Sequence, residues 1–210
     1  MRLRSMMVVC VAGLFLVSLP VYADITNGGF ETGDFSGWNI SGIYTCVATT
    51  LCGGNADDTD PGPQAGSYAA YLGSPGNLNG QGQADDQLSQ TVVTTAGQNY
   101  TLDFFLAVGS TSASGGALPN SFAVSWDGST LAALNDLPSQ SYKEYSYSVT
   151  GTGSDTLLFD TAMYPSVFVL DSISLTEVSA STPEPTSVVL LLTMLSAVAF
   201  GARKRIARGL

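Results

Sequence analysis

Short apolar stretches separated by Gly, Ser, Thr, Asn and Asp make up most of the chain between residues 24 and 182. No long part of this region repeats its apolar residues every 3.6 positions with caps at its ends, as an amphipathic helix would. The stretches are rich in Val, Tyr, Phe and Leu, and several alternate apolar with polar residues, which is typical of β-strands. We therefore expect an all-β domain of about eight strands, folded as a β-sandwich of the jelly-roll type.

The expected strands follow these stretches along the chain. They are residues 38–47, 67–72, 86–94, 99–108, 122–126, 145–149, 157–160 and 167–175. Asp127-Gly128 predicts a two-residue hairpin turn. The run 99–108 is almost continuously apolar after Tyr100, which predicts a central strand buried on both faces. The order of the strands does not follow from the pattern.

The first 23 residues form a separate segment. Arg2 and Arg4 precede an apolar run over residues 6–19, and Val21-Tyr22-Ala23 is an acceptable cleavage site. This order is typical of a secretory signal peptide, so the mature chain should begin near Asp24.

The last 31 residues contain three further parts. Residues 180–185 form a linker that includes Pro183-Glu184-Pro185, residues 186–202 are uncharged and mostly apolar, and residues 203–210 are basic. The basic residues are Arg203, Lys204, Arg205 and Arg208. An apolar segment can cross a bilayer, and a cationic end stays in the cytoplasm. We expect a transmembrane helix at 186–202, short against the roughly 20 residues of a typical span.

This three-part tail resembles the PEP-CTERM sorting signal of exopolysaccharide-producing Gram-negative bacteria. The resemblance implies an exosortase-type processing enzyme as a partner, which would recognise Pro183, Glu184 and Pro185 outside the inner membrane. The chain would then be exported, anchored transiently by its C-terminal helix, and released to the cell surface or extracellular matrix. An ordinary C-terminal membrane anchor is the alternative.

Charge separates the predicted domain from its ends. The region 24–182 holds sixteen acidic residues and one basic residue, Lys143, a formal charge of −15. Nucleic-acid binding depends on Lys and Arg that neutralise phosphates, so we expect no nucleic-acid partner. The charge is compatible with divalent cations or neutral glycans, or simply with solubility.

The chain has no histidine, which excludes Ser-His-Asp and Cys-His catalytic sites. Two carboxylates could still hydrolyse glycosides, so a glycosidase or lyase stays open as an alternative. Cys46 and Cys52 are the two cysteines of the predicted mature domain. In an oxidising compartment this spacing predicts a structural disulfide, worth about 2 kcal/mol for so short a loop.

Two segments that bracket the domain carry a second resemblance. Asn27-Gly-Gly-Phe-Glu31 begins it and Leu170-Asp-Ser-Ile-Ser-Leu175 ends it, with Gly66-Ser-Tyr-Ala-Ala-Tyr71 and Gly97-Gln-Asn-Tyr-Thr-Leu102 between them. This set is similar to jelly-roll carbohydrate-binding modules and related domains of PEP-CTERM proteins. The resemblance implies a structural calcium site with Glu31 and Asp171 as ligands. The alternative is that both carboxylates are simply exposed.

Other acidic residues and the aromatics give weaker indications. Asp57-Asp58-x-Asp60 and Asp85-Asp86 are interpreted as solvated loops rather than ion sites, and Trp38 and Trp126 as core residues. The tyrosine candidates for a binding face are Tyr44, Tyr68, Tyr71, Tyr142 and Tyr164. No single glycan-contacting residue follows from the sequence.

The sequence therefore predicts an exported, non-enzymatic surface or matrix protein whose β-sandwich binds polysaccharide, with exopolysaccharide as the expected ligand. A purely structural matrix or adhesion protein, which would self-associate without binding sugar, is the first alternative.

Overall fold

The computed structural model describes residues 23–42, 45–49, 61–73, 85–110, 119–163, 166–178 and 193–195. Contacts within the chain divide it into two compact units, Met1–Glu177 and Val178–Leu210. The described strands and hydrophobic core residues all lie in the first unit, between Ala23 and Glu177. This segment therefore contains a complete core of its own.

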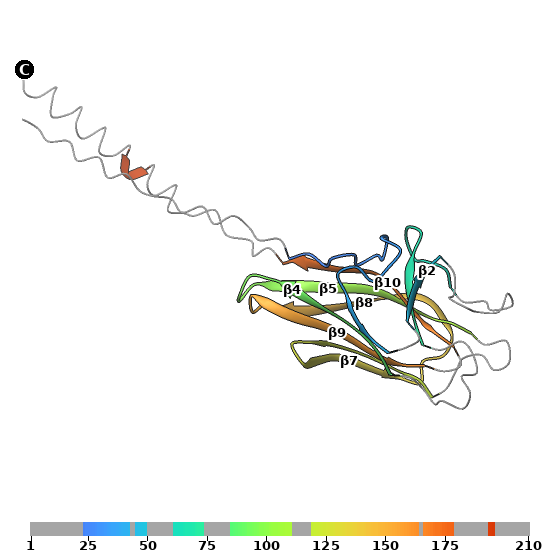
Figure 1. Cartoon of the computed structure of the whole chain (residues 1–210). Helices are drawn as coiled ribbons and strands as arrows, with labels where there is room; N and C mark the ends of the chain where they lie inside the picture. Colours follow the sequence, from blue (N-terminus) through green and yellow to red (C-terminus); the bar gives the residue numbers. More distant parts are fainter. Residues whose placement is uncertain are drawn as a thin grey trace, which may run out of the picture. The chain divides into compact units, whose positions relative to one another are not determined.

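The described residues of the first unit form ten strands (Figure 1). They are β1 (Asn39–Ser41), β2 (Cys46–Ala48), β3 (Ala69–Leu72), β4 (Asp85–Val93), β5 (Asn99–Val108), β6 (Ser121–Trp126), β7 (Ser129–Asn135), β8 (Gln140–Thr150), β9 (Ser154–Ala162) and β10 (Phe168–Glu177). All pairings are antiparallel.

The strands form two five-stranded sheets. Sheet I has the order β1-β4-β9-β6-β7, and sheet II has the order β2-β3-β10-β5-β8. Without β1 and β2, the eight strands β3 to β10 follow the order of two interleaved Greek keys, which is that of a jelly roll. The predicted β-sandwich is confirmed. β7 and β8 are edge strands of sheet I and sheet II, respectively.

The core lies between the sheets and is rich in aromatic rings. Alternation places Phe122, Val124 and Trp126 of β6 on its inner face, as predicted. Phe104 of β5 meets Phe159 of β9 edge to face, with ring centroids 5.2 Å apart. Such contacts between the sheets add to the free energy gained by burying the rings.

The segment before β1 contains no strand, yet it packs against the core. Phe30 is fully buried, and Trp38 is 7% exposed and donates from Nε1 to the Asn27 carbonyl at 3.2 Å. Gln90 of β4 holds the segment, because its side chain bonds both the N–H and the carbonyl of Thr26, at 2.8 and 2.9 Å. The prediction that Trp38 and Trp126 are core residues is confirmed.

The predicted single strand over residues 38–47 is wrong. β1 and β2 both fall in this region, but they belong to different sheets. Gly42, which follows β1, has a φ of 116° and comes so close to Asp86 that an added Cβ would lie 2.0 Å from Asp86 Oδ1. The backbone therefore leaves sheet I at a position where a side chain would not fit.

Two expectations of burial are also corrected. β5 is not buried on both faces along its length, because every second residue of Asn99–Phe105 is at least partly exposed and only Leu106–Val108 are buried throughout. The Asp85-Asp86 pair does not lie in a solvated loop, since both residues belong to β4. Asp86 is 1% exposed and accepts a hydrogen bond from the Gly73 N–H at 3.0 Å.

In the second unit the structure describes Thr193–Leu195, which are helical. Among the described residues, no helix has the length and apolar character needed to cross a membrane. The predicted transmembrane helix at 186–202 falls almost wholly outside the described part of the chain.

Candidate functional site

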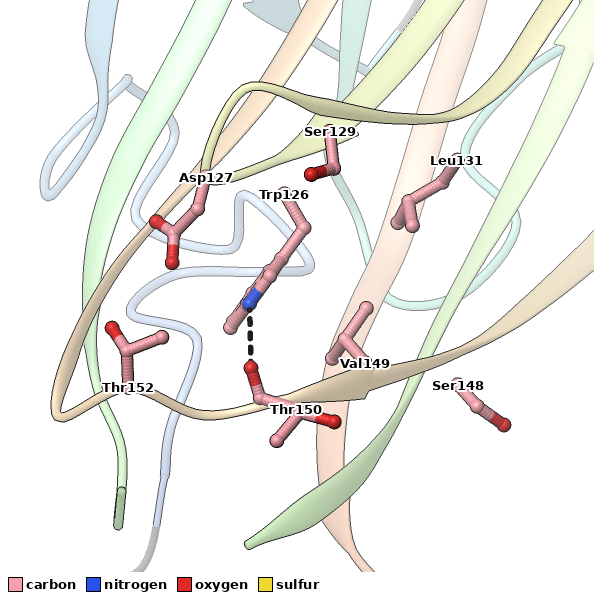
Figure 2. Close-up of a pocket in the computed structure, with 8 residues that line it drawn as sticks. All are labelled: Trp126, Asp127, Ser129, Leu131, Ser148, Val149, Thr150 and Thr152. Atoms are coloured by element: carbon pink, nitrogen blue, oxygen red, sulfur yellow. Dashed lines mark hydrogen bonds between the residues drawn. The ribbon is translucent and has the colours of Figure 1, made fainter. Parts of the chain in front are cut away.

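A pocket of about 310 Å³ opens at the edge of the sandwich where the last residues of β6 and β8 approach each other (Figure 2). The β6–β7 turn and the start of β7 form one wall, and the end of β8 and the turn into β9 form the other. Its lining is Trp126, Asp127, Ser129, Leu131, Ser148, Val149, Thr150 and Thr152. We call it the Trp126 pocket.

The floor of the Trp126 pocket is apolar. Trp126 is 5% exposed, and its Nε1 donates to the Thr150 carbonyl at 3.2 Å, which fixes the indole ring between the two sheets. Leu131 and Val149 lie on the same side of the ring in Figure 2. Because the indole N–H is already bonded within the protein, Trp126 offers a ligand its apolar surface.

The rim of the pocket is polar. Asp127, Ser129 and Thr152 are exposed, and Ser129 and Thr152 each carry a hydroxyl. Asp127 Oδ1 accepts the Thr156 N–H at 2.7 Å, which holds the carboxylate at the turn. Ser148 contributes less, since its side chain points away from Trp126 in Figure 2.

The two turns that carry this rim have a defined local geometry. Asp127 and Gly128 have φ values of 48° and 74°, as a tight two-residue hairpin turn requires, so the turn predicted at this dipeptide is confirmed. On the opposite wall, the fully buried Asp155 accepts hydrogen bonds from Thr94 Oγ1 and from the Thr152 N–H, the latter at 2.9 Å. Both turns are therefore held by carboxylates.

The pKa of Asp155 reflects the hydrogen bonds that its carboxylate makes within the protein. Burial acts to raise the pKa, but hydrogen bonds with Thr94, Asp127 and Thr152 outweigh it, so the pKa lies below its ordinary value. Asp155 is therefore charged at neutral pH, and it lies within hydrogen-bonding reach of Asp127. Neither carboxylate has a Lys or Arg partner in the part of the chain that the structure describes.

A second candidate site lies where the first and last segments of the domain meet. A Cβ placed on Gly29 would lie 3.8 Å from Asp171 Oδ1 and 3.8 Å from Glu31 Cγ, so the structure places these two carboxylates close together. Asp171 is fully buried. Burial, opposed by backbone hydrogen bonds but reinforced by the charge of Glu31, raises the pKa of Asp171 above its ordinary value.

The 61–68 segment closes over this carboxylate pair. Asp171 Oδ2 accepts the N–H groups of Gln64 and Ala65 at 2.8 and 3.2 Å. Glu31 Oε1 accepts those of Ser67 and Tyr68, both at 3.0 Å. The second oxygen of each carboxylate is also bonded, because Glu31 Oε2 accepts the Ser67 N–H at 3.0 Å and Asp171 Oδ1 accepts the Ser172 N–H at 2.5 Å.

The carboxylates of Glu31 and Asp171 are suitable ligands for a calcium ion. Two anionic carboxylates from distant segments converge, and calcium binds six to eight oxygens, including backbone carbonyls and water. Within the described residues no group of three or more acidic or cysteine side chains could hold a metal. A calcium ion here would therefore take Glu31 and Asp171 as its side-chain ligands and backbone or water oxygens as the rest.

Three of the five tyrosines proposed for a binding face are among the described residues, and two of them donate hydrogen bonds within the protein. Tyr71 is 1% exposed and donates to the Pro61 carbonyl at 3.1 Å, and Tyr142 donates to the Gly62 carbonyl at 2.9 Å. Burial, with the nearby charge of Asp171, raises the pKa of Tyr142, so its hydroxyl remains a donor. Tyr68 is half-buried against the core, and Tyr44 and Tyr164 lie outside the described residues.

Neither the pocket nor the position of one aromatic residue on a sheet face is predicted by the sequence. Trp126 is a core residue as predicted, but nothing in a single sequence shows that the core opens beside it. Phe105 is half-buried on the outer face of sheet II, on the same side as Thr101 and Asp103. Phe105 follows Asp103 by two residues, and residues two apart on a strand share a face, so the sequence does contain an indication that Phe105 faces outward.

Several predicted features cannot be placed. Cys46 is the first residue of β2, but Cys52 is outside the described residues, so their pairing stays a prediction. Residues 1–22 of the predicted signal peptide at 1–23 also lie outside them. So do the Asp57-Asp58-x-Asp60 cluster, the Pro183-Glu184-Pro185 motif and the basic residues Arg203, Lys204, Arg205 and Arg208.

No family model and no curated protein matches the chain. Solved structures do resemble it. The K1 cleaved adhesin domain of Lys-gingipain from Porphyromonas gingivalis W83 has a TM-score of 0.51 and 13% identity, over 72% of this chain and 96% of that chain. The enzymatically active domain of tailspike protein 4 from bacteriophage CBA120 has a TM-score of 0.50 and 12% identity, over 73% and 21%. TmCBM61 in complex with β-1,4-galactotriose has a TM-score of 0.49 and 19% identity, over 73% and 97%. The first two show that the β-sandwich fold is shared.

Proposed function

We propose that this protein is an exported surface or matrix protein whose β-sandwich binds polysaccharide without cleaving it. The Trp126 pocket is the observation that carries the proposal. It combines an apolar floor of Trp126, Leu131 and Val149 with a rim of hydroxyls and a carboxylate. Small-molecule sites commonly combine a mainly apolar lining with a few polar groups that fix orientation.

A sugar ring suits this combination. Its C–H face is apolar and packs on flat or aliphatic side chains, while its hydroxyls need hydrogen-bond partners when they leave water. In the pocket, Trp126 and Leu131 supply the apolar contact, and Asp127, Ser129 and Thr152 supply the partners. The volume of about 310 Å³ lies at the lower end of typical ligand pockets, which suits one sugar residue rather than a long chain.

The arrangement of the carboxylates favours binding over catalysis. Glycoside hydrolysis uses two carboxyl groups on either side of the scissile bond. Asp155, the neighbour of Asp127, is fully buried and bonded to Thr94 and Thr152, so it does not face the pocket as a free acid or base. We expect no release of reducing sugar from any polysaccharide that the domain binds.

A pocket-filling substitution tests the binding function. Ser129→Trp places a large ring at the exposed wall of the pocket, whereas Thr130→Trp places the same ring on the next residue of β7, which does not line the pocket. Purified residues 24–178 would be assayed for retention on immobilised exopolysaccharides, with thermal melting to verify that both variants fold.

We expect the wild type and Thr130→Trp to be retained, and Ser129→Trp to be lost. Equal retention of both variants would place sugar binding elsewhere. The absence of retention on all polysaccharides would leave the purely structural matrix role as the better account.

We also propose that calcium binds between Glu31 and Asp171 and joins the two ends of the domain. Its support is the convergence of two carboxylates with no basic partner among the described residues. The ion would neutralise their mutual repulsion and hold the 61–68 segment through the same carboxylates.

We also propose that the protein is exported and then sorted through its C-terminal segment. The support is the order of a signal peptide, a Pro-Glu-Pro tripeptide, an apolar run and a basic end in the sequence. An exosortase-type enzyme and the inner membrane are the partners that this order implies.

A further inference from the structure

We infer that the Trp126 pocket selects a positively charged sugar residue, an amino sugar with a free amine, over neutral and acidic sugars. This inference rests on the proposed function and names the ligand class of the same pocket. Asp127 is part of the pocket lining, and its Oδ1 bond to the Thr156 N–H holds the carboxylate in place beside the floor.

The local charge is negative and uncompensated. Asp155 lies behind Asp127 and is fully buried, and its hydrogen-bond partners are Thr94, Thr152 and the Asp127 side chain rather than a base. The pocket lining contains one acidic residue and no basic residue. An ammonium group beside Asp127 therefore gains a charge-assisted hydrogen bond, and a carboxylate on the sugar is repelled.

Lys143, the one basic residue between residues 24 and 182, is too far away to reverse this preference. It lies on β8 above the Tyr145 ring, with Nζ 5.0 Å from the ring centroid. Val149 of the pocket is six residues further along the same strand, about 20 Å at the rise of an extended strand. That separation exceeds the roughly 8 Å screening length at physiological ionic strength.

The local backbone fixes the position of Asp127 in the turn. Asp127 has a φ of 48°, a conformation that Asp and Asn adopt more readily than most residues. The neutral Asn is therefore a substitution that preserves the turn and can keep the acceptor for the Thr156 N–H. Asp127→Asn removes the charge with little change of shape.

The experiment compares three probes of matched length: β-1,4-linked glucosamine, its fully N-acetylated form, and oligogalacturonate. Binding to residues 24–178, which contain the complete core, would be measured at about pH 6, below the ordinary pKa of an amine. The readout is the indole N–H resonance of Trp126, with that of Trp38 as an internal reference. Glu144→Gln, which removes an exposed carboxylate on β8 outside the pocket, is the control of equal charge.

We expect the glucosamine oligomer to bind about three- to fivefold more tightly than the N-acetylated oligomer. We expect no shift with oligogalacturonate. Asp127→Asn should abolish the preference while N-acetylated oligomer still binds, and Glu144→Gln should keep the preference. A preference that survives Asp127→Asn, or equal affinities in the wild type, would overturn the inference while leaving the proposed function intact. If no saccharide shifts the Trp126 resonance and Ser129→Trp changes nothing, the proposed function itself fails.

Discussion

Gly28 shows how one absent side chain allows the two ends of the domain to meet. A Cβ at this position would lie 2.0 Å from the Ile173 carbonyl oxygen, and the Gly28 carbonyl accepts the Ile173 N–H at 2.9 Å. Gly28→Ala should therefore destabilise the domain by about 3 kcal/mol, because the clash is with backbone and cannot be relieved by a rotamer change. Urea denaturation of residues 24–178 would measure the loss.

Gly62→Ala is the matched control for this prediction. Gly62 has no heavy atom within 4 Å of a built Cβ and has no left-handed φ, so alanine there should be neutral or slightly stabilising. If both variants unfold at the same urea concentration as the wild type, the close approach at Gly28 is not required.

Asp171 makes the stability depend on pH in a defined direction. Burial, together with the charge of Glu31, raises its pKa above the ordinary value of 3.8, so the folded state favours the neutral acid. Its contribution to stability is fully present below the unfolded value and is lost as the pH rises through the folded pKa. With chelator present, the melting temperature of the wild type should therefore fall relative to that of Asp171→Asn as the pH rises above about 4, and calcium at neutral pH should restore it.

Asp171→Asn tests whether this residue causes the effect. The variant should lose part of the pH dependence and the response to calcium, whereas Asp160→Asn, the same charge change on a partly exposed position of β9, should keep both. A melting temperature of the wild type that is identical with calcium and with chelator would refute the calcium proposal.

At the scale of elements, the β6–β7 hairpin depends on the left-handed backbone of its turn. Gly128 has a φ of 74° and open space around a built Cβ, so a substitution is opposed by backbone strain alone. Gly128→Ala should cost about 1–2 kcal/mol, and Gly128→Asn should cost less, because Asn tolerates this conformation. Comparing the denaturation midpoints of the two variants tests the turn, and equal losses would mean that strain at Gly128 is not the cause.

At the scale of the whole molecule, the chain combines a self-contained sandwich with two terminal segments of a different composition. If the sorting tail functions as proposed, Glu184→Ala should cause an unprocessed precursor to accumulate in the membrane fraction of the producing cells. Pulse-labelling would follow the precursor, with Glu177→Ala, an acidic residue at the end of β10, as the control. Normal processing of the Glu184→Ala chain would favour an ordinary anchor.

The sequence by itself determined the all-β class, most strand positions, the turn at Asp127-Gly128 and the inward face of Trp126. These features depend on residue alternation and on turn chemistry, which act over a few neighbouring residues. It also determined the acidic charge of the domain, which is a sum over residues and needs no fold.

The tertiary structure alone decided which segments meet. The split of residues 38–47 between two sheets, the outward position of Phe105 and the burial of Asp86 and Asp171 depend on pairing between distant strands. The Trp126 pocket has the same origin, because its walls are two turns that belong to different strand pairs. Alternation along a strand shows which side chains share a face, but it does not show which edge of the other sheet lies opposite them.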